Sequence, residues 1–454
     1  MLKSLFLSSL LLCASNVLAL PAEARIPQPD NDPFYTPPAG FESKAPGTVL
    51  KNRRVISSFL GLIPDPVETH QILYRSTSIN GSAIAGVTTI FKPLFAKKDR
   101  FVSFQTAYDS SATKCNPSFN YQLGSGQPFE DAILSAELLI IQAYLLSGYV
   151  VSSSDYEGPD AAFTPGLLEG MVGLDSMKAV GNYGSKVGLN TKSPKILGVG
   201  YSGGGLGTSW AASLQPTYAP ELNVKGWIAG GVPANLTAVL NYIDNSAFSG
   251  FIPVAISGLA KPSAYGAQLG PVIDKYVTPT GKELLDFAST HCATDCLVKF
   301  FEKSIYSPEY QTLGTGLLSE PTVAKVLAEN VLGQEQAKAP KAPVLLYHAS
   351  KDEVIPYSNV QQLRSDWCSQ GVPVEFVTWQ AGGHVTTEAL GLPDALSFAK
   401  KVFDGAGPTS CSQSARVNET LNPLALADLE PIAFALIDLL FGHKKTPTRG
   451  TIIE

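Results

Sequence analysis

The sequence predicts an α/β fold, in which a mostly parallel central sheet carries helices on both faces and a helical insertion interrupts the chain. Strand-like and helix-like segments alternate between residues 101 and 231, which is the rhythm of parallel strands joined by crossover helices. The apolar run at 196–199 enters a glycine-rich turn, and a small-residue segment that can start a helix follows it. The rhythm stops between about residues 235 and 321, and strands resume at 344–348 and 374–379.

The chain begins with a predicted secretory signal peptide, residues 1–19. Lys3 precedes an apolar run that is too short to span a membrane, and the small residues near Ala19 suit cleavage. No later segment is long and apolar enough to replace this run as a membrane anchor. We therefore expect a secreted, extracellular protein.

After the signal peptide we divide the chain into three parts. Residues 20–234 are the first part of the core, 235–325 a helical cap or lid, and 326–454 the second part of the core. Within the first part, the proline-rich residues 26–51 predict an extended arm that wraps the surface.

The elements of the core follow in order along the chain. Strands at 71–78 and 85–92 flank the Asn80-Gly81 turn and predict a hairpin. The next predicted elements are a strand at 101–108, a helix at 130–146, a strand at 149–154, a helix at 167–180 and, beyond the glycine-rich turn, a strand at 226–231.

The cap shows helical patterns at 282–287 and 295–303. Its apolar run at 248–256 either lines an acyl-chain pocket or forms the core of the cap itself. A last helix at 424–441 is apolar on most sides, so we expect it to pack against another part of the molecule.

Composition and charge limit the function classes. A net charge of −6 and a pI of about 5.5 give no indication of nucleic-acid binding. Charged residues make up only 16% of the chain, and such a weakly ionic surface is compatible with an enzyme that works near lipid.

Five cysteines remain once Cys13 leaves with the signal peptide, so at most two disulfides form in the oxidising compartment. Cys368 and Cys411 are expected to pair, and Cys115 is expected to reach Cys292 or Cys296. Glycosylation acceptors, usable where exposed, are Asn80, Asn235 and Asn418.

The glycine-rich turn reads G-x-S-x-G, with Ser202 at its centre. On a sharp turn from strand to helix the serine adopts a strained backbone, and side chains two residues away would collide, which explains Gly200 and Gly204. Such a turn exposes the serine hydroxyl as a nucleophile, but the pentapeptide also occurs as a tight connection or a phosphate loop. Whether the sequence also contains a base and an acid for Ser202 distinguishes these interpretations.

The sequence contains only five histidines, so the search for a base is short. His70 precedes Ser202 and has the wrong order for an open α/β hydrolase, whose nucleophile comes before the acid and the histidine. Three others lie in the cap, inside a strand or near the basic C-terminus: His291, His348 and His443. His384 alone follows a strand directly, and we assign it as the base.

The acid is predicted in the loop after residues 344–348. Asp352 stands where that strand becomes a loop, and Glu353 is its rival one residue later. We assign Asp352, because the shorter side chain is commoner in this role.

An oxyanion hole needs two backbone donors. One is expected from the N–H of Gly203, directly after the nucleophile, and the other from the N–H of Asp109, in the loop after the strand at 101–108.

Together these segments resemble the fungal secretory lipase family of the α/β-hydrolase superfamily. The resemblance covers nearly the whole mature chain and includes the regions of Asp352 and His384. Its further motifs are DPFY at 32–35, GFES at 40–43, YDS at 108–110, DYEGP at 155–159, GYSGG at 200–204 and GGVPANLT at 230–237.

The resemblance implies an α/β-hydrolase fold with a helical cap over an acyl tunnel and with a C-terminal flap. It also implies Ser202 as nucleophile, Asp352 as acid and His384 as base, with no cofactor and no metal. Two disulfides are implied, Cys115–Cys296 and Cys368–Cys411, which leaves Cys292 free.

The function that follows from these assignments is that of a secreted serine lipase. It is expected to be a monomer that hydrolyses triacylglycerol or another lipid ester at an oil-water interface through an acyl-enzyme, touching lipid only peripherally. The alternatives are a carboxylesterase or acyltransferase on shorter or non-glyceride esters, a serine hydrolase that cleaves acyl-peptides, or, in a different class, a catalytically dead secreted lipid-binding protein.

Overall fold

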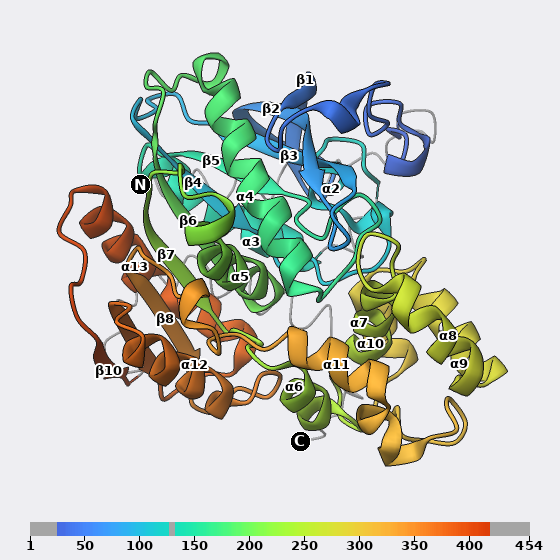
Figure 1. The fold of residues 1–454 in the computed structure, drawn as a ribbon. Coiled ribbons are helices and arrows are strands. Elements are labelled where there is room, and N and C mark those ends of the chain that lie inside the picture. The colour runs from blue at the N-terminus through green and yellow to red at the C-terminus, as the bar shows by residue number, and fades with distance from the viewer. Residues whose placement is uncertain (1–24, 127–131, 418–454) are drawn as a thin grey trace, which may run out of the picture.

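The structure, a computed structural model, describes residues 25–126 and 132–417 (Figure 1). The predicted signal peptide, the predicted helix at 424–441, Asn418 and His443 lie outside the described residues. The flap that the family resemblance implies therefore stays a prediction.

A ten-stranded sheet organises the chain, in the order β1-β2-β3-β5-β4-β6-β7-β8-β9-β10. The ladders from β1 to β5 are antiparallel, and all those from β5 to β10 are parallel. The strands are β1 (Val49–Phe59), β2 (Ile63–Thr77), β3 (Ala83–Lys92), β4 (Arg100–Gln105), β5 (Val150–Ser154), β6 (Lys195–Tyr201), β7 (Val224–Gly230), β8 (Val344–Ala349), β9 (Val374–Trp379) and β10 (Ser412–Arg416). The predicted mostly parallel sheet is thus confirmed.

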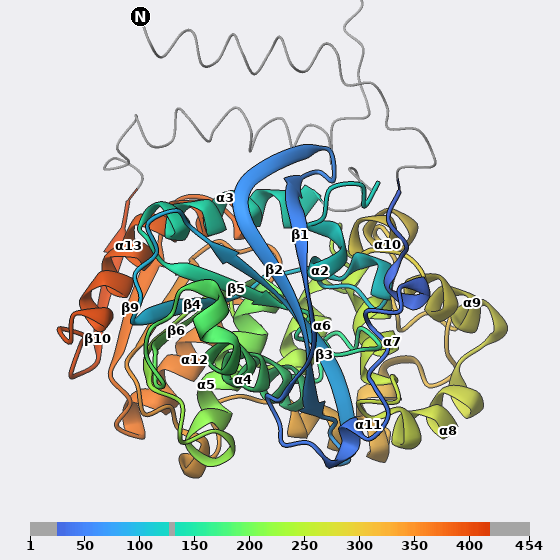
Figure 2. The same cartoon turned by 90° about the horizontal axis from the view of Figure 1, so that it is seen from above.

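Helices cover both faces of the sheet, as Figure 2 shows from above. One face carries α4 (Gly166–Tyr183), α5 (Ser202–Tyr218) and α12 (Tyr357–Ser369), and the other carries α3 (Ala132–Leu146) and α13 (His384–Phe403). In β8 the side chains alternate between the two layers: Val344 and Leu346 pack on the first face, Leu345 and Tyr347 on the second. Both faces of the strand are therefore buried, which explains its continuous apolar sequence.

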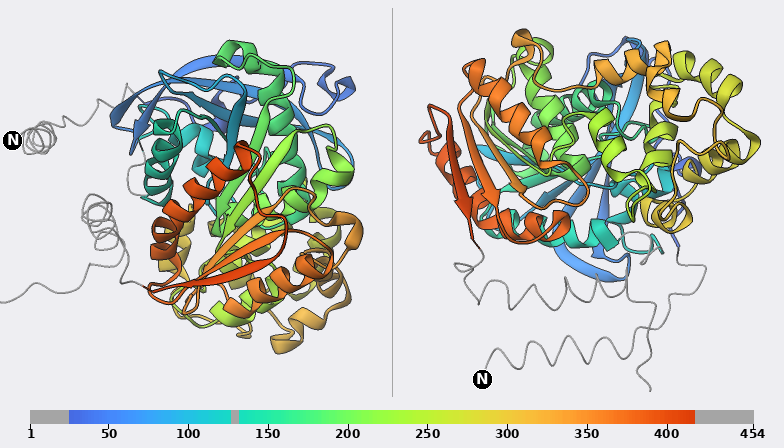
Figure 3. Two further views of the ribbon diagram at one scale, coloured as in Figure 1. Left: turned by 90° about the vertical axis from the view of Figure 1, so that its left-hand side faces the viewer. Right: turned by 90° about the horizontal axis from the view of Figure 1, so that it is seen from below.

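The insertion between β7 and β8 consists of short helices that gather beside one end of the sheet (Figures 1 and 3). They are α6 (Leu236–Ile243), α7 (Phe251–Leu259), α8 (Gly266–Tyr276), α9 (Pro279–Ala288), α10 (Ala293–Lys299), the 3-10 helix η6 (Gly314–Ser319) and α11 (Pro321–Glu329). We call this insertion the cap. Its helices form their own apolar clusters, which also include Val354 and Ile355 from the loop after β8.

The edge strands β1 and β10 were not predicted. Neither strand has an apolar pattern, because the middle of β1, around Arg53 and Arg54, is polar and β10 is Ser-Gln-Ser-Ala-Arg. An edge strand is held by backbone hydrogen bonds to one neighbour and needs no apolar face of its own. The predicted arm therefore ends earlier than expected, where β1 begins.

The structure contains two disulfides among its described residues, Cys115–Cys292 and Cys368–Cys411. The expected Cys115–Cys296 pairing is wrong. Cys292 precedes α10 and lies in an apolar cluster with Ala112 and Cys115, whereas Cys296 lies one turn later and packs into the cap beside Phe163. Cys296 is a buried free thiol, and burial raises its pKa to about 12.

Candidate active site

Ser202 is the first residue of α5 and has a φ of 52°, the left-handed region that is strained for a residue with a side chain. The chain turns this sharply because two glycines lie against backbone. A Cβ atom on Gly200 would lie 2.1 Å from the Gly204 carbonyl oxygen, and one on Gly204 would lie 1.9 Å from the Gln105 carbonyl oxygen. The expected steric need for both glycines is confirmed, and the half-buried Ser202 side chain is left at the end of the sheet.

The structure brings Ser202, His384 and Asp352 into one hydrogen-bonded series. His384 Nδ1 lies 2.7 Å from Asp352 Oδ2, and His384 Nε2 lies 2.8 Å from Ser202 Oγ. Because an ionised carboxylate only accepts, Nδ1 carries the hydrogen, so Nε2 is free to accept the hydrogen of the serine hydroxyl. This is the arrangement in which a histidine can remove a proton from a serine.

Asp352 and His384 stabilise each other's charged forms. Burial by itself would raise the pKa of Asp352, but the charge and hydrogen bond of His384 outweigh burial and lower it. Burial by itself would lower the pKa of His384, but Asp352 outweighs it and raises this pKa above its ordinary value. The N–H groups of Val354 and Ile355 also donate to Asp352 Oδ1, over 2.9 and 2.7 Å.

Two residues that were not assigned to the site position the backbone of His384. The rival acid Glu353 accepts a 2.9 Å hydrogen bond from the His384 N–H, so it contacts the backbone and not the imidazole. Tyr201 donates a 2.6 Å hydrogen bond from its hydroxyl to the His384 carbonyl oxygen. Their places next to Asp352 and Ser202 in the sequence are a weak signal, and only the fold shows that both reach His384.

Gly203 and Asp109 lie beside each other next to Ser202. Asp109 has a φ of 44°, is 5% exposed, and its Oδ1 has no hydrogen-bond partner among the described residues. Burial raises the pKa of Asp109 to about 7. A hydrogen bond two residues before Asp109 holds this loop in place: the buried Glu137 accepts it from the Ala107 N–H over 2.8 Å.

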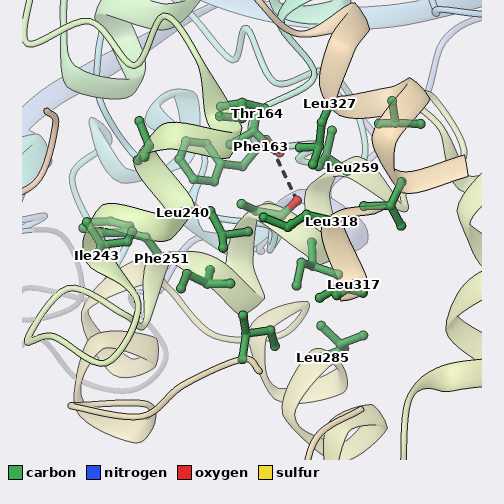
Figure 4. A pocket seen from close by; sticks show the side chains of 18 of the residues that line it. Phe163, Thr164, Leu240, Ile243, Phe251, Leu259, Leu285, Leu317, Leu318 and Leu327 are labelled. Atoms are coloured by element: carbon green, nitrogen blue, oxygen red, sulfur yellow. Dashed lines mark hydrogen bonds between the residues drawn. The ribbon is translucent and has the colours of Figure 1, made fainter. Parts of the chain in front are cut away.

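A cavity of about 1420 Å³, counting the space open to solvent, extends from Ser202, Gly203 and Asp109 into the cap. Figure 4 shows apolar side chains pointing into it from several cap helices. The run at 248–256 contributes Phe251, Ile252, Ala255 and Ile256 to this lining, all four from α7. Further lining residues are Phe163, Leu240, Ile243, Leu259, Leu285, Leu317, Leu318 and Leu327.

The remaining histidines of the described part lie away from Ser202 or serve other contacts. His70 in β2 lies 2.9 Å from Glu68 and 3.1 Å from the Tyr183 hydroxyl. His291 stacks on Phe287 in the cap, with ring centroids 3.8 Å apart. His348, set aside as part of a strand, lies 3.2 Å from Asp352 and was missed. The available signal was its place four residues before Asp352, at the end of β8.

The two described glycosylation acceptors differ in environment. Asn80 is exposed at the turn between β2 and β3. Asn235 is half-buried and caps α6, where its Oδ1 accepts from the Ala238 N–H over 3.2 Å. Glycosylation at either asparagine stays a prediction.

Within residues 25–126 and 132–417, no helix is long and apolar enough to cross a membrane. Nor do three or more His, Cys, Asp or Glu side chains come together there in a way that could hold a metal ion.

A profile of the family described as "Secretory lipase" matches residues 123–411, which include Ser202, Asp352 and His384. The chain belongs to the secretory lipase family. Its resemblance to fungal secretory lipases is confirmed, and the secretory character of the family confirms the expected secreted location.

Relatives of this secretory lipase are similar over most of their length. It is 34% identical to secreted triacylglycerol lipase LIP4 of Malassezia globosa over 456 residues, 99% of this chain and 98% of the relative. It is 38% identical to secreted triacylglycerol lipase LIP2 of Malassezia furfur over 423 residues, 92% of this chain and 89% of the relative.

Solved structures agree with the fold of this secretory lipase. The closed state of Candida antarctica lipase A matches with a TM-score of 0.79 and 29% identity, over 92% of this chain and 96% of the other. The expected α/β-hydrolase fold is confirmed. The Xanthomonas oryzae esterase LipA matches with a TM-score of 0.59 at 16% identity, over 80% of this chain and 100% of the other, and shows likeness of fold alone.

Proposed function

We propose that this secretory lipase hydrolyses triacylglycerols, with Ser202 as nucleophile, His384 as general base and Asp352 as the acid that orients His384. One observation carries the proposal: the hydrogen-bonded series of these three side chains ends at the mouth of an apolar cavity. The series supplies acyl-transfer chemistry, and the cavity suits the hydrocarbon chain of a fatty acid.

The proposed reaction has two halves. In the first, His384 Nε2 takes the proton of Ser202 as Oγ attacks the ester carbonyl carbon, and His384 then gives that proton to the departing alcohol. In the second, His384 takes a proton from water, the resulting hydroxide attacks the acyl-enzyme, and the fatty acid leaves as Ser202 recovers its proton. Asp352 stays ionised throughout and stabilises the imidazolium that forms in each half.

The N–H groups of Gly203 and Asp109 are the proposed oxyanion donors. Gly203 lies in the first turn of α5, where backbone N–H groups have no partner within the helix. Asp109 lies against Gly203, and both residues line the cavity beside Ser202. Donors fixed in position before the reaction cost no reorganisation when negative charge develops on the carbonyl oxygen.

The apolar part of the cavity that lies in the cap favours a lipid ester as substrate. The cavity wall beyond Ser202 is formed mainly by Leu, Ile, Val and Phe side chains, among them Leu240, Phe251 and Leu318, which offer no partner to a polar acyl group. Several of the most similar relatives are named triacylglycerol lipases, which supports the same substrate class. We propose that the monomer acts at an oil-water interface.

The test compares triolein, tributyrin and a soluble short-chain ester as substrates of the wild type and of two serine variants. Ser202→Ala is expected to abolish hydrolysis of all three with an unchanged unfolding temperature. Ser209→Ala is the matched control, because Ser209 is a buried serine two turns further along the same helix. This control is expected to keep wild-type rates.

The outcomes separate the remaining hypotheses. Activity confined to the soluble short ester would favour a carboxylesterase over a lipase. Absence of all hydrolysis in the wild type, combined with binding of triolein, would favour a lipid-binding protein. Wild-type rates in Ser202→Ala would contradict the proposed mechanism altogether.

A further inference from the structure

His348 lies inside β8 near its end, and its side chain is completely buried. Its Nε2 atom lies 3.1 Å from the Ile355 carbonyl oxygen. A carbonyl oxygen can only accept, so Nε2 must carry the ring hydrogen. The contact with Ile355 therefore selects one tautomer of His348.

The same Nε2 atom also lies close to the acid of the site, although its hydrogen bond goes to Ile355. It lies 3.2 Å from Asp352 Oδ2, the oxygen that accepts from His384 Nδ1 over 2.7 Å. The other oxygen of Asp352 accepts from two backbone N–H groups. Two histidines thus lie against a single carboxylate oxygen. His384 donates to it, whereas the hydrogen bond of His348 goes to Ile355, whose own N–H donates to Asp352 Oδ1.

His348 is a neutral donor. Burial lowers its pKa to about 4, although the charge of Asp352 opposes this shift. Its Nδ1 atom has no hydrogen-bond partner among the described residues. The groups that face its ring are Asp352, His384 and the Tyr357 ring, whose centroid lies 5.9 Å away. A second cation beside Asp352 would compete with His384 for the carboxylate, and a neutral donor does not.

We propose that His348 is a positioning residue that holds the Asp352 carboxylate in the orientation from which it accepts the His384 Nδ1–H. This inference rests on the proposed function, because it assigns His348 a role through Asp352. The rotation of an aspartate carboxylate is soft, so the direction of Oδ2 depends on its donors. His348 holds Ile355 through its carbonyl, and the Ile355 N–H donates to Asp352 Oδ1, so this link limits the rotation while Oδ2 stays available to His384.

The test uses a pair of variants that differ in the donor. His348→Phe keeps a ring of similar size but has no N–H, whereas His348→Gln can place an amide N–H near the position of Nε2. Rates are measured on a soluble ester and divided by the fraction of molecules that a fluorophosphonate labels. His348→Phe is expected to lower kcat by about tenfold with KM nearly unchanged, as for the loss of one buried hydrogen bond. His348→Gln is expected to restore most of kcat.

Nuclear magnetic resonance of the ¹⁵N-histidine-labelled wild type supplies a readout that a purely structural role would not change. His348 is expected as the neutral Nε2–H tautomer, and the signal of the His384 Nδ1–H is expected to weaken or shift in His348→Phe and to return in His348→Gln. Should His348→Phe fail to fold, His348→Asn takes its place, because its amide is too short to reach the position of Nε2.

Three results would overturn the inference: an unchanged kcat in His348→Phe, equal losses in the Phe and Gln variants, or an Nδ1–H tautomer at His348. Each is distinct from a failure of the proposed function. If Ser202→Ala keeps its activity, the nucleophile is wrong; if Ser202→Ala is inactive and His348→Phe is normal, only the role of His348 is wrong.

Discussion

Gly203 and Asp109 are packed so closely that a Cβ atom on Gly203 would lie 1.8 Å from Asp109 Oδ1. Phe163 closes the same space from another side, 3.2 Å from that position. The two proposed oxyanion donors can lie this close only because Gly203 has no side chain. A methyl group at Gly203 would have to displace the Asp109 loop.

Gly203→Ala is predicted to disrupt the proposed oxyanion hole. Moving the Asp109 N–H away from the oxyanion position is expected to lower kcat by on the order of 10²–10³, the usual effect of losing one oxyanion donor. Substrate binding in the cap is not touched, so KM should change much less. Steady-state kinetics on a soluble ester measure both constants.

Gly181→Ala is the control for this variant. Gly181 lies in α4, and a Cβ atom there would meet nothing within 4 Å. It should keep wild-type kinetics and gain up to about 1 kcal/mol of stability, because alanine favours a helix more than glycine does. Equal kinetics for Gly203→Ala and Gly181→Ala would contradict the assigned oxyanion hole.

The pH dependence of kcat/KM follows from the raised pKa of His384. Only the neutral imidazole can accept the serine proton, and a raised pKa keeps the protonated form to higher pH. As the pH is lowered, kcat/KM is therefore expected to fall with a midpoint above about pH 6.5, the ordinary pKa of histidine. We call this fall the acid limb. A profile on a soluble ester that stays flat well below this pH would contradict the raised pKa of His384.

Asp352→Asn removes the charge that raises this pKa. The acid limb should move to lower pH, and kcat should fall by as much as about 10⁴, the loss known for the corresponding change in serine proteases. Asp366→Asn serves as the matched control, since Asp366 lies on α12 and its carboxylate accepts from the Gln362 side chain. An unmoved acid limb in Asp352→Asn would show that another group orients His384.

Stability is expected to fall as the pH rises from mildly acidic to alkaline values. Burial raises the pKa of Asp155 to about 7 and raises those of Glu157 and Glu169 well above the usual value. The folded state then holds protons that the unfolded state has released, so stability is greatest below the unfolded pKa and declines towards the folded one. Thermal unfolding between about pH 5 and pH 8 measures the decline.

Glu157→Gln tests the origin of that decline. The amide carries no titrating proton, so the unfolding temperature of this variant should depend less steeply on pH than that of the wild type. Glu283→Gln on the cap helix α9 is the control, because Glu283 is exposed. Identical slopes for wild type and Glu157→Gln would exclude Glu157 as a cause of the decline.

The cysteine pairing predicts a peptide map. Proteolysis without reduction should yield a Cys115–Cys292 cross-link, and alkylation should modify Cys296 only after unfolding, because the thiol is buried. Cys115→Ser is expected to lower stability by about 2–5 kcal/mol, whereas Cys296→Ser should cost less. A Cys115–Cys296 cross-link, or a rapidly alkylated Cys296 in the native state, would contradict the structure.

Local sequence patterns were enough to predict the parallel part of the sheet and the turn at Ser202. Buried parallel strands need continuous apolar runs, and a sharp turn needs Gly200 and Gly204, so both leave clear marks in the sequence. Asp352 and His384 could be predicted because each follows such a strand. The chemistry of the site is therefore largely encoded by position after a strand.

Contacts that depend on packing across the fold could not be predicted. Cys292 and Cys296 lie one helical turn apart, so only the placement of α10 against Ala112 decides which of them meets Cys115. The place of His348 four residues before Asp352 was the one available signal, and it does not show that the ring lies against Asp352. The edge strands β1 and β10 could not be predicted for a related reason, because strands held by backbone pairing need no apolar pattern in their sequence.

Ser202 is proposed to form the covalent bond to the acyl group. The most direct test of this role is peptide mapping after reaction with a fluorophosphonate, which stays on the nucleophile. We predict one adduct per molecule, on the peptide that contains Ser202, and a strongly slowed reaction in His384→Ala. An adduct on another residue, or no adduct in an enzyme that still hydrolyses triolein, would contradict the account.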